Sequence, residues 1–502
     1  MLSELVANLG LGFSMAVTPV NLVYCLVGVF LGTLIGILPG LGPIATIAML
    51  LPVSYGLDPL AALILIAGVY YGAQYGGSTT AILVNMPGEA SSVVTCLDGY
   101  QMARKGRAGA ALSISAMGSF VAGTVGTLLL AAFAVPLGKV ALSFGPAEYF
   151  SLMVLGMIAA VVLAKGSVLK AIGMILVGIV LGLVGLDINA GTPRFSFDIP
   201  ELADGINTGI IALAMFGIGD IIVNLERQDK REIFAKSVSG LWLTATEFVR
   251  AVPAVLRGTG LGSMLGVLPG GGATLSSFAA YSLEKKISKN PQEFGHGAIE
   301  GVAGPEAANN AAAQTSFIPL LTLGLPSNAV MALMVSAMTI HQIQPGPQVM
   351  TNNPSLFWGL IASMWVGNLM LVILNLPLIG LWIKMLSVPY RLLYPAILLF
   401  CCIGTYSLSN SPFDAALTAV LGVLGYLFAK LDCETAPLLL GFVLGPMMEE
   451  SLRRALLVSR GDPSILVTRP ISATILLIAL LLLALMVAPR LRKQRDRAFA
   501  ES

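Results

Sequence analysis

One stretch of this sequence occurs twice, first as Gly32-Thr33-Leu34-Ile35-Gly36-Ile37-Leu38-Pro39-Gly40-Leu41-Gly42 and again, 230 positions later, as Gly262-Ser263-Met264-Leu265-Gly266-Val267-Leu268-Pro269-Gly270-Gly271-Gly272. Both copies run from an apolar segment into a Pro-Gly break and directly into a second apolar segment. A repeat of this length indicates a fold built from two related halves. Apolar helices that are broken at corresponding places in two halves are typical of the binding sites of secondary transporters.

The composition indicates a membrane protein. The 502 residues are 56% hydrophobic and 11% charged, whereas a soluble globular protein carries about 25% charged residues. Residues 59–88 and 307–383 contain no Asp, Glu, Lys or Arg, and each run exceeds the roughly 20 residues that cross a bilayer once. The apolar runs are continuous rather than alternating, which disfavours a β-barrel. We therefore expect an all-α polytopic membrane protein, and the net charge of +2 gives no reason to expect nucleic acid.

The pattern predicts about twelve transmembrane segments in two inverted repeats with broken helices or re-entrant hairpins, an elevator-like transporter architecture. The expected ranges are 18–38, 43–56, 59–86 (broken), 108–134, 146–164, 167–186 and 207–225, then 258–268, 273–283, 302–344 (broken), 356–383, 392–409, 413–429 and 433–448, with a last helix at 471–489. The predicted domains are a first membrane repeat at 1–225, a cytoplasmic or interfacial amphipathic linker at 226–257, a second membrane repeat at 258–448, and a terminal helix with a basic cytoplasmic tail at 449–502.

The distribution of charge predicts which loops lie on which side. The basic tail after Pro489, the basic loop at 104–107 and the stretch 226–257 should be cytoplasmic by the positive-inside rule. The mostly acidic loop 187–204 should lie outside. The two copies of the repeat then enter the membrane from opposite faces, as inverted repeats do. Arg453, Arg454 and Arg460 are an exception, because this count puts them in an outside loop or requires 433–448 to be re-entrant.

The breaks provide the candidate binding residues. An unwound helix exposes N–H groups and a partial positive charge that suit a carboxylate, while its freed carbonyl oxygens suit a cation. The predicted substrate-binding residues are Pro39, Gly40, Gly42, Gly76, Gly77, Ser78, Thr79, Thr80, Pro269, Gly270, Gly271, Gly272, Thr274, Gln314, Thr315 and Ser316. The coupling-ion candidates are Asn85, Glu89, Glu306, Asn309, Asn310, Ser327 and Asn328. The alternative for each small or hydroxyl residue is that it only packs or kinks a membrane helix.

Acidic residues in apolar stretches are functional candidates by default, which applies to Glu89 and Glu306. Asp220 stands in Gly217-Ile218-Gly219-Asp220, the GxGD pattern of intramembrane aspartyl proteases. Such proteases need a second carboxylate, and no apolar helix supplies a matching Tyr-Asp pair, so a helix-end role for Asp220 is the stronger interpretation. An ion-conducting channel is a further alternative. The sequence contains no Walker A motif and no metal-ligand spacing, so we expect neither enzymatic activity nor a cofactor beyond a coupling cation, Na⁺ or H⁺.

These motifs together resemble one family. Gly36-Ile37-Leu38-Pro39-Gly40-Leu41-Gly42, the Tyr71–Thr80 run, Asn85-Met86-Pro87-Gly88-Glu89 and Gly304-Pro305-Glu306-Ala307-Ala308-Asn309-Asn310 are similar to the large membrane subunit of tripartite tricarboxylate transporters, over nearly the whole chain. The resemblance implies a permease of the bacterial inner membrane that takes up carboxylates such as citrate with a coupling ion. It also implies two partners, a small membrane subunit of about four helices and a periplasmic solute-binding protein, and allows a homodimer of the complex.

Overall fold

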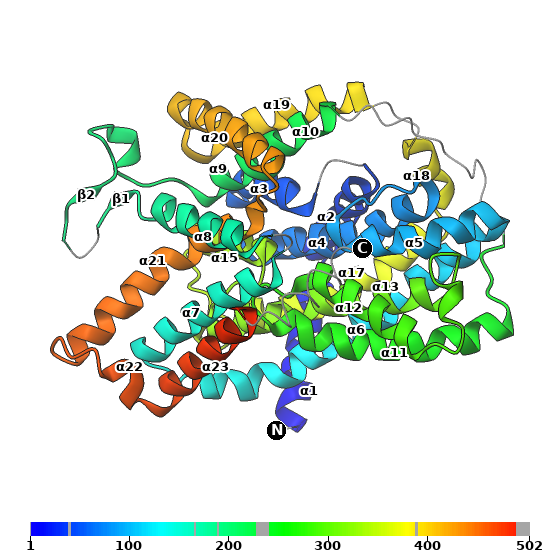
Figure 1. Ribbon diagram of the computed structural model, residues 1–502, viewed down its shortest axis with the longest axis horizontal. Coiled ribbons are helices and arrows are strands. Elements are labelled where there is room, and N and C mark those ends of the chain that lie inside the picture. Colours follow the sequence, from blue (N-terminus) through cyan, green and yellow to red (C-terminus); the bar gives the residue numbers. More distant parts are fainter. Residues whose placement is uncertain are drawn as a thin grey trace.

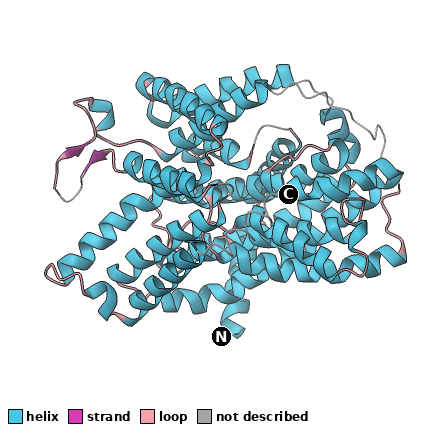
Figure 2. Cartoon of the chain, in the orientation of Figure 1, coloured by secondary structure: helices cyan, strands magenta, loops and turns pink. Residues whose placement is uncertain are grey.

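The computed structural model describes residues 2–38, 42–164, 167–187, 190–226, 240–386 and 390–487, and these are almost entirely helical (Figures 1 and 2). The first part of the chain forms α1 (Leu2–Ala16), α2 (Pro19–Ile37), α3 (Pro43–Tyr55), α4 (Pro59–Val84), η1 (Ala90–Ser92), α5 (Val93–Met102), η2 (Ala103–Arg107), α6 (Ala108–Ala141), α7 (Pro146–Leu163), α8 (Val168–Gly182), β1 (Gly185–Leu186), β2 (Pro193–Arg194), η3 (Pro200–Leu202), α9 (Thr208–Ala212), η4 (Leu213–Ile218) and α10 (Gly219–Glu226).

The second part forms α11 (Ala245–Val267), α12 (Gly272–Ile287), η5 (Pro291–Glu293), α13 (Glu300–Thr315), α14 (Phe317–Leu323), α15 (Ala329–Ile340), α16 (Gln348–Asn352), α17 (Pro354–Asn375), α18 (Ile379–Leu386), α19 (Tyr390–Ser409), α20 (Pro412–Lys430), α21 (Thr435–Val458), α22 (Ile465–Thr468) and α23 (Pro470–Val487). Within the described ranges, seven helical segments are long and apolar enough to cross a membrane. The all-α polytopic class is therefore confirmed, while twelve spans and an elevator architecture remain predictions.

Proline sets the start of many of these helices. Seven of the described α-helices, α2, α3, α4, α7, α17, α20 and α23, begin with a proline. The first helical residue needs no N–H for the helix ladder, and the fixed φ of proline already suits the helix. This is why the starts expected near 18, 43, 59, 146, 356 and 413 agree with the structure to within two residues.

Matching rows of glycine join the first helices of each half to their partners. A Cβ at Gly28, Gly32 or Gly36 of α2 would lie 2.4 Å from the carbonyl oxygens of Leu65, Val69 and Ala73 of α4, respectively. In the second half, a Cβ at Gly258, Gly262 or Gly266 of α11 would lie 2.2, 2.2 and 2.5 Å from the carbonyl oxygens of Gly304, Ala308 and Ala312 of α13. Each glycine of the first row is 230 positions before its counterpart in the second row, and each partner residue is 239 positions before its counterpart. The two halves thus repeat the same close helix contact, which small residues permit.

The break expected within 59–86 is wrong, because α4 is continuous to Val84 and ends at Asn85, whose φ of 59° is left-handed. The hydroxyl oxygens of Ser78, Thr79 and Thr80 lie 2.9, 3.3 and 3.3 Å from the carbonyl oxygen four residues earlier. The neighbouring glycine Gly76 faces α2 so closely that a Cβ there would lie 2.2 Å from the Thr33 carbonyl oxygen. Packing against α2 therefore keeps a Gly-rich segment helical that would be weak in isolation.

The second broken region is confirmed, because 302–344 is divided among α13, α14 and α15. The helix α11 runs without interruption from Ala245 to Val267, across the limit predicted between the linker and the second repeat, and the division into these domains stays a prediction. Residues 227–239 of that linker and the basic tail lie outside the described residues. The placing of Arg453 and Arg454 in a loop is also wrong, since α21 continues through both of them to Val458.

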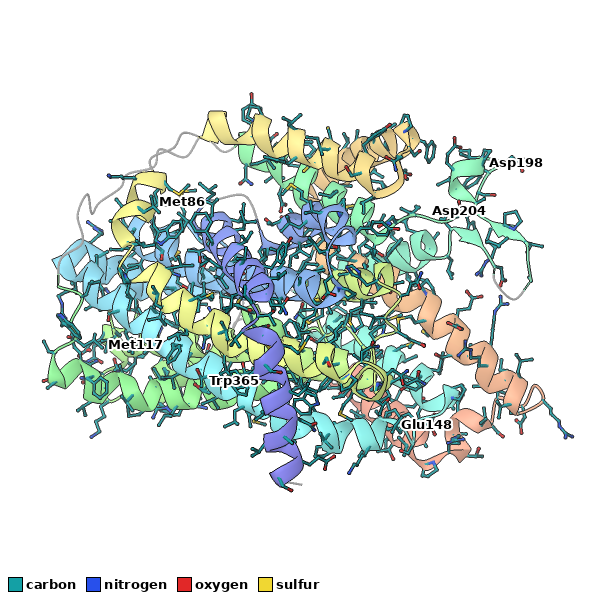
Figure 3. All side chains as sticks on the ribbon, turned by 180° about the vertical axis from the view of Figure 1, so that it is seen from behind. Met86, Met117, Glu148, Asp198, Asp204 and Trp365 are labelled. Atoms are coloured by element: carbon teal, nitrogen blue, oxygen red, sulfur yellow. The ribbon has the colours of Figure 1, made fainter. Side chains whose placement is uncertain are left out.

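Ion pairs connect the end of α21 to the loop that was expected outside. Arg453 lies 2.9 Å from an Asp187 carboxylate oxygen, and Arg194 lies 2.9 Å from Glu449. The strand β1 directly precedes this loop and β2 lies within it; the two pair antiparallel and project from the helical body (Figure 1). Figure 3 shows Asp198 and Asp204 at the same extremity. The loop 187–204 and the end of α21 therefore lie on one side of the protein.

The helices form three groups that meet at the centre (Figure 1). One contains α2, α4, α6, α11, α13 and α17; a second contains α7, α8, α21 and α23; a third contains α3, η4, α10, α19 and α20. The second group has its own apolar cluster, which includes Met153, Ile175 and Leu444. Figure 3 shows Glu148 of this group at the periphery, where Arg469 pairs with it at 2.6 Å, and Trp365 beside α1, where it stacks on Phe13 with ring centroids 5.8 Å apart.

Candidate functional site

Residues at the ends of the breaks in both halves line one cavity of about 470 Å³. Gly42 and Pro43 contribute from the first break, and Gly270, Gly271 and Gly272 contribute from the second. The wall is completed by Ile44, Tyr70, Gln74, Pro87, Gly88, Glu89, Ala90, Ser91, Leu163, Phe216, Asp220, Asn224, Ala273, Thr274, Leu275, Phe278, Asn328, Ala329, Val330, Glu434, Thr435 and Ala436. The volume falls within the range of small-molecule sites, about 300–1,000 Å³. Segments that are far apart in the sequence thus surround a space of the size of a small solute.

Two helices begin at this cavity without a side-chain cap. The N-cap residues of α3 and α12 are Gly42 and Gly271, and neither start receives a hydrogen bond from a side chain. The first N–H groups of a helix have no partner within the helix, and the helix dipole gives this end a partial positive charge. No lysine or arginine is among the described residues of the wall. The arrangement can therefore hold an anion by backbone N–H groups alone.

The backbone at the second break needs glycine. Gly270 has a φ of +77°, and a Cβ there would lie 2.6 Å from the Ala160 Cα of α7. The Gly270 N–H donates to the Ser327 carbonyl oxygen at 2.7 Å, which connects this break to the start of α15. Gly272 also has a positive φ, +53°, but a Cβ there would meet only Asn328, at 3.7 Å. Close backbone packing thus fixes the shape of the cavity at Gly270.

Three polar side chains of the first half form a closed group at the wall. The Gln74 amide donates from Nε2 to Glu89 Oε2 at 3.1 Å, and Ser91 Oγ lies 2.7 Å from Gln74 Oε1. Ser91 also contacts Glu89 Oε1. Gly77 makes room for Glu89, because a Cβ at this position would lie 2.9 Å from Glu89 Cγ.

A second carboxyl group lies behind this wall. Glu306 is completely buried, and three hydroxyl groups contact it, those of Ser78 at 2.5 Å, Ser115 at 3.1 Å and Thr95. No ion pair to Glu306 or Glu89 is found within the described residues. Burying a carboxyl group is costly unless it is hydrogen-bonded or paired, and at Glu306 the hydroxyl groups provide the compensation.

The polar contacts of the two halves cross at the cavity. Tyr70 of α4 receives a hydrogen bond from Asn328 Nδ2, and Asn309 of α13 donates to Ser91, both at 3.5 Å. Asn309 follows Tyr70 by 239 positions, the spacing that also relates the helix partners of the glycine rows. Each half therefore sends a side chain from its buried helix to the loop of the other half.

The structure adds residues that the sequence analysis did not select. Phe216, Asp220 and Asn224 line the cavity at a spacing of four residues, which puts them on one helical face. Asp220 is in the first turn of α10, within the candidate span Thr208–Glu226. The sequence indicates this face by Asp220 and Asn224, an acidic residue and an amide four positions apart in an apolar run. No comparable pattern indicates Gln74, Tyr70 or Ser91.

Some of the predicted site residues line the cavity, and others lie outside its wall. Gly42, Gly270, Gly271, Gly272, Thr274, Glu89 and Asn328 line the cavity. Buried positions outside the cavity wall are occupied by Gly76, Gly77, Ser78, Thr79, Thr80, Gln314, Thr315, Ser316, Glu306, Asn309, Asn310 and Ser327, while Asn85 is exposed and Pro269 is partly buried. Pro39 and Gly40 lie outside the described residues. For the residues behind the wall the contacts show packing and hydrogen bonding, and a direct contact with a solute stays a prediction.

The family model of the tripartite tricarboxylate transporter TctA family matches residues 22–440, which include both repeats and every described residue of the cavity wall. The chain belongs to this family. Transport as a component of a tripartite system follows from membership, and such a system has other subunits. The TctA family is a transporter family, so the protease interpretation of Asp220 has no support.

Two curated relatives of this TctA-family chain are uncharacterized proteins of Agrobacterium vitis. The 52.8 kDa protein in the TAR-I ttuC' 3' region is 60% identical over 498 residues, 99% of either chain. The protein in the TAR-II ttuC' 3' region is 63% identical over 240 residues, which are 48% of this chain and 99% of the relative. No solved structure matches the TctA-family chain.

Proposed function

We propose that this chain is the large permease subunit of a binding-protein-dependent system that takes up carboxylates across the bacterial inner membrane, driven by a coupling cation. The observation that carries the proposal is the shared cavity with its two uncapped helix starts and no lysine or arginine in the described wall. A helix start stabilises an anion by about 0.3–1 kcal/mol when exposed and by up to about 2 kcal/mol when partly buried. Two starts in one cavity suit a solute with more than one carboxylate group.

The proposed mechanism moves the cavity between the two faces of the membrane. The glycine contacts join α2 to α4 and α11 to α13 into closely packed pairs, whereas α7, α8 and α21 share a separate apolar cluster. This division supports an elevator, in which the paired helices and the breaks slide against a scaffold, in preference to rocking of two rigid halves. Disulfide crosslinks between the breaks and α7 should therefore stop uptake, and crosslinked protein that still transports would exclude the elevator.

The predicted partners complete the proposal. A periplasmic solute-binding protein would deliver the carboxylate, and a small membrane subunit of about four helices would accompany this chain. The C-terminus would be cytoplasmic. Copurification of the affinity-tagged chain with these two subunits from its native host tests the assembly.

Uptake into proteoliposomes tests the function itself. The complex, supplied with its binding protein and radiolabelled citrate as the first probe of a panel of di- and tricarboxylates, should show saturable uptake that requires an ion gradient. A channel would instead pass a non-saturating current. If no carboxylate of the panel is taken up while the complex is intact, the proposed function is wrong.

A further inference from the structure

We propose that Glu89 and Glu306 form a proton-carrying pair, connected through Gln74, Ser78 and Ser91, and that the proton on this pair is the coupling ion of transport. The inference rests on the proposed function and goes beyond it by naming the ion and the groups that carry it. It is argued from the number of hydrogen atoms available to the contacts, from the space around both carboxyl groups, and from their position relative to the cavity.

The contacts around Glu89 need one hydrogen more than the ionised group provides. Gln74, Ser91 and Glu89 make three mutual contacts. A serine hydroxyl has one hydrogen, and an ionised carboxylate has none. With the Gln74 amide as placed, Ser91 can donate either to Gln74 or to Glu89. With this amide reversed, the Gln74 amide oxygen faces the Glu89 carboxylate oxygen without a hydrogen between them. All three contacts become hydrogen bonds only when Glu89 carries a proton, which it donates to Ser91 with the amide as placed and to the Gln74 amide oxygen with the amide reversed.

The same count applies to Glu306. Ser78 Oγ lies 2.9 Å from the Gln74 carbonyl oxygen and 2.5 Å from Glu306 Oε2, and its single hydrogen can serve one of them. When Glu306 is ionised, Ser78 turns its hydrogen toward the carboxylate. When Glu306 is protonated, it donates to Ser78, which then donates to the backbone of Gln74. Rotation of one hydroxyl group thus accommodates both states without movement of a helix.

The space around Glu306 admits a proton but no metal ion. A hard cation is held by a shell of roughly six or more oxygen ligands around its own volume. Here the hydroxyl groups of Ser78, Thr95 and Ser115 contact the carboxylate oxygens directly, and the side chain has no exposed surface. Within the described part of the chain, no group of three or more His, Cys, Asp or Glu side chains is placed to hold a metal ion. A proton neutralises the carboxyl group without needing volume.

The position of Glu89 provides the physical coupling. Glu89 lines the cavity into which α3 and α12 direct their helix starts. An anion bound there is repelled by an ionised Glu89 and is not repelled by the neutral form. Anion binding and protonation therefore favour each other, and this linkage is reciprocal. The proton enters with the carboxylate and is released with it when the cavity opens to the other side.

Other titratable groups lie around the pair on several elements. Tyr70 faces Glu89, while Tyr75 and Cys96 face Glu306. Asp98 of α5 is held by the Tyr281 hydroxyl at 2.9 Å and by the backbone amides of Gly297 and Ala298. Asp220 and Glu434 line the cavity on α10 and at the start of α21. The control is Glu148 of α7, a buried carboxyl group that lies outside the cavity wall and is paired with Arg469 at 2.6 Å.

The first experiment measures binding linkage in the reconstituted complex. The apparent affinity for the carboxylate that the uptake panel identifies should fall by up to about tenfold for each pH unit above the titration of the pair, and uptake should carry protons inward, as reported by an internal pH dye. Glu89→Gln and Glu306→Gln should bind with little pH dependence and exchange labelled substrate without accumulating it. Glu148→Gln should keep the proton linkage. Saturable uptake in the wild type without proton movement, or linkage retained in both Glu89→Gln and Glu306→Gln, would overturn the inference and leave the proposed function intact.

The second experiment needs no substrate. Infrared difference spectra of the purified complex in lipid, recorded after a pH change, should contain the carbonyl band of a protonated carboxyl group. Glu89→Gln and Glu306→Gln should each remove part of that band, and Glu148→Gln, which changes a carboxyl group paired with Arg469, should not. If the band is unchanged in both Glu89→Gln and Glu306→Gln, neither group carries the proton, whatever the uptake panel shows.

Discussion

The contact between α11 and α13 predicts a large difference between two alanine substitutions that are two residues apart. A Cβ at Gly262 would lie 2.2 Å from the Ala308 carbonyl oxygen and 2.7 Å from its Cα. A Cβ at Gly260 of the same helix would have no neighbour within 4 Å. Gly260→Ala is therefore a control for the effect of alanine on the helix itself.

The magnitude follows from helix propensity and from the overlap. Alanine favours a helix over glycine by about 1 kcal/mol, which should stabilise Gly260→Ala. Carbon atoms in contact lie about 3.5–4.0 Å apart, so Gly262→Ala requires the two backbones to separate by roughly 1 Å. Overpacking of this kind costs about 1–3 kcal/mol, and the upper value applies here because a backbone cannot rotate away. The two variants should thus differ by about 3 kcal/mol in the free energy of unfolding.

Thermal unfolding of the detergent-solubilised protein measures this difference. The unfolding entropy of about 2.1 cal/mol/K per residue amounts to about 1 kcal/mol/K over 502 residues. Gly262→Ala should therefore melt about 3 °C below Gly260→Ala, and Gly32→Ala, the counterpart in the first half, should behave like Gly262→Ala. Equal melting temperatures for Gly262→Ala and Gly260→Ala would refute the close contact between the two helices.

Three further outcomes are expected. Gly270→Val and Gly271→Val should each abolish carboxylate uptake while membrane insertion is retained. A β-branched side chain does not suit the positive φ of Gly270, and at Gly271 its Cβ would lie 2.2 Å from a backbone oxygen. Full uptake by both variants would disprove a site at this break. Asn328→Ala should lower the free energy of unfolding by about 1 kcal/mol, because the residue caps α15, whereas Asn328→Asp should keep the cap, a comparison made by chemical denaturation. Arg469→Ala should lower the melting temperature by leaving the buried Glu148 carboxylate unpaired, at a cost of about 1–3 kcal/mol, and the addition of Glu148→Gln should restore part of it; a double variant as unstable as the single one would contradict this.

Much of the helix order could be predicted because its signals are local. A proline at the first helical position is visible in the sequence, so the starts of α2, α3, α4 and α7 agreed with the structure. The Pro-Gly breaks were also visible, and Gly270, Gly271 and Gly272 do line the cavity. These features depend on backbone preferences of neighbouring residues, which sequence reasoning can evaluate.

The continuity of α4 could not be predicted for the opposite reason. Gly76 and Gly77 weaken a helix locally, but their effect depends on α2, which approaches so closely that Cβ atoms would clash there. The same limit explains the missed wall residues. Asp220 and Gln74 reach one cavity only after helices more than a hundred residues apart have packed together.

The two halves share the backbone features that would bind an anion, but they do not share the carboxyl groups. Both halves reproduce the glycine contacts and the uncapped helix start, so the anion-binding backbone is duplicated. The carboxyl groups are not: at the spacing of 239 positions, Glu89 corresponds to Asn328 and Glu306 corresponds to Ala67. If backbone N–H groups hold the anion and the carboxyl groups hold the proton, a substitution that makes the halves alike should affect only the second property. Glu89→Asn should therefore retain carboxylate binding and lose its dependence on pH, whereas loss of binding itself would mean that Glu89 contributes to the anion site directly.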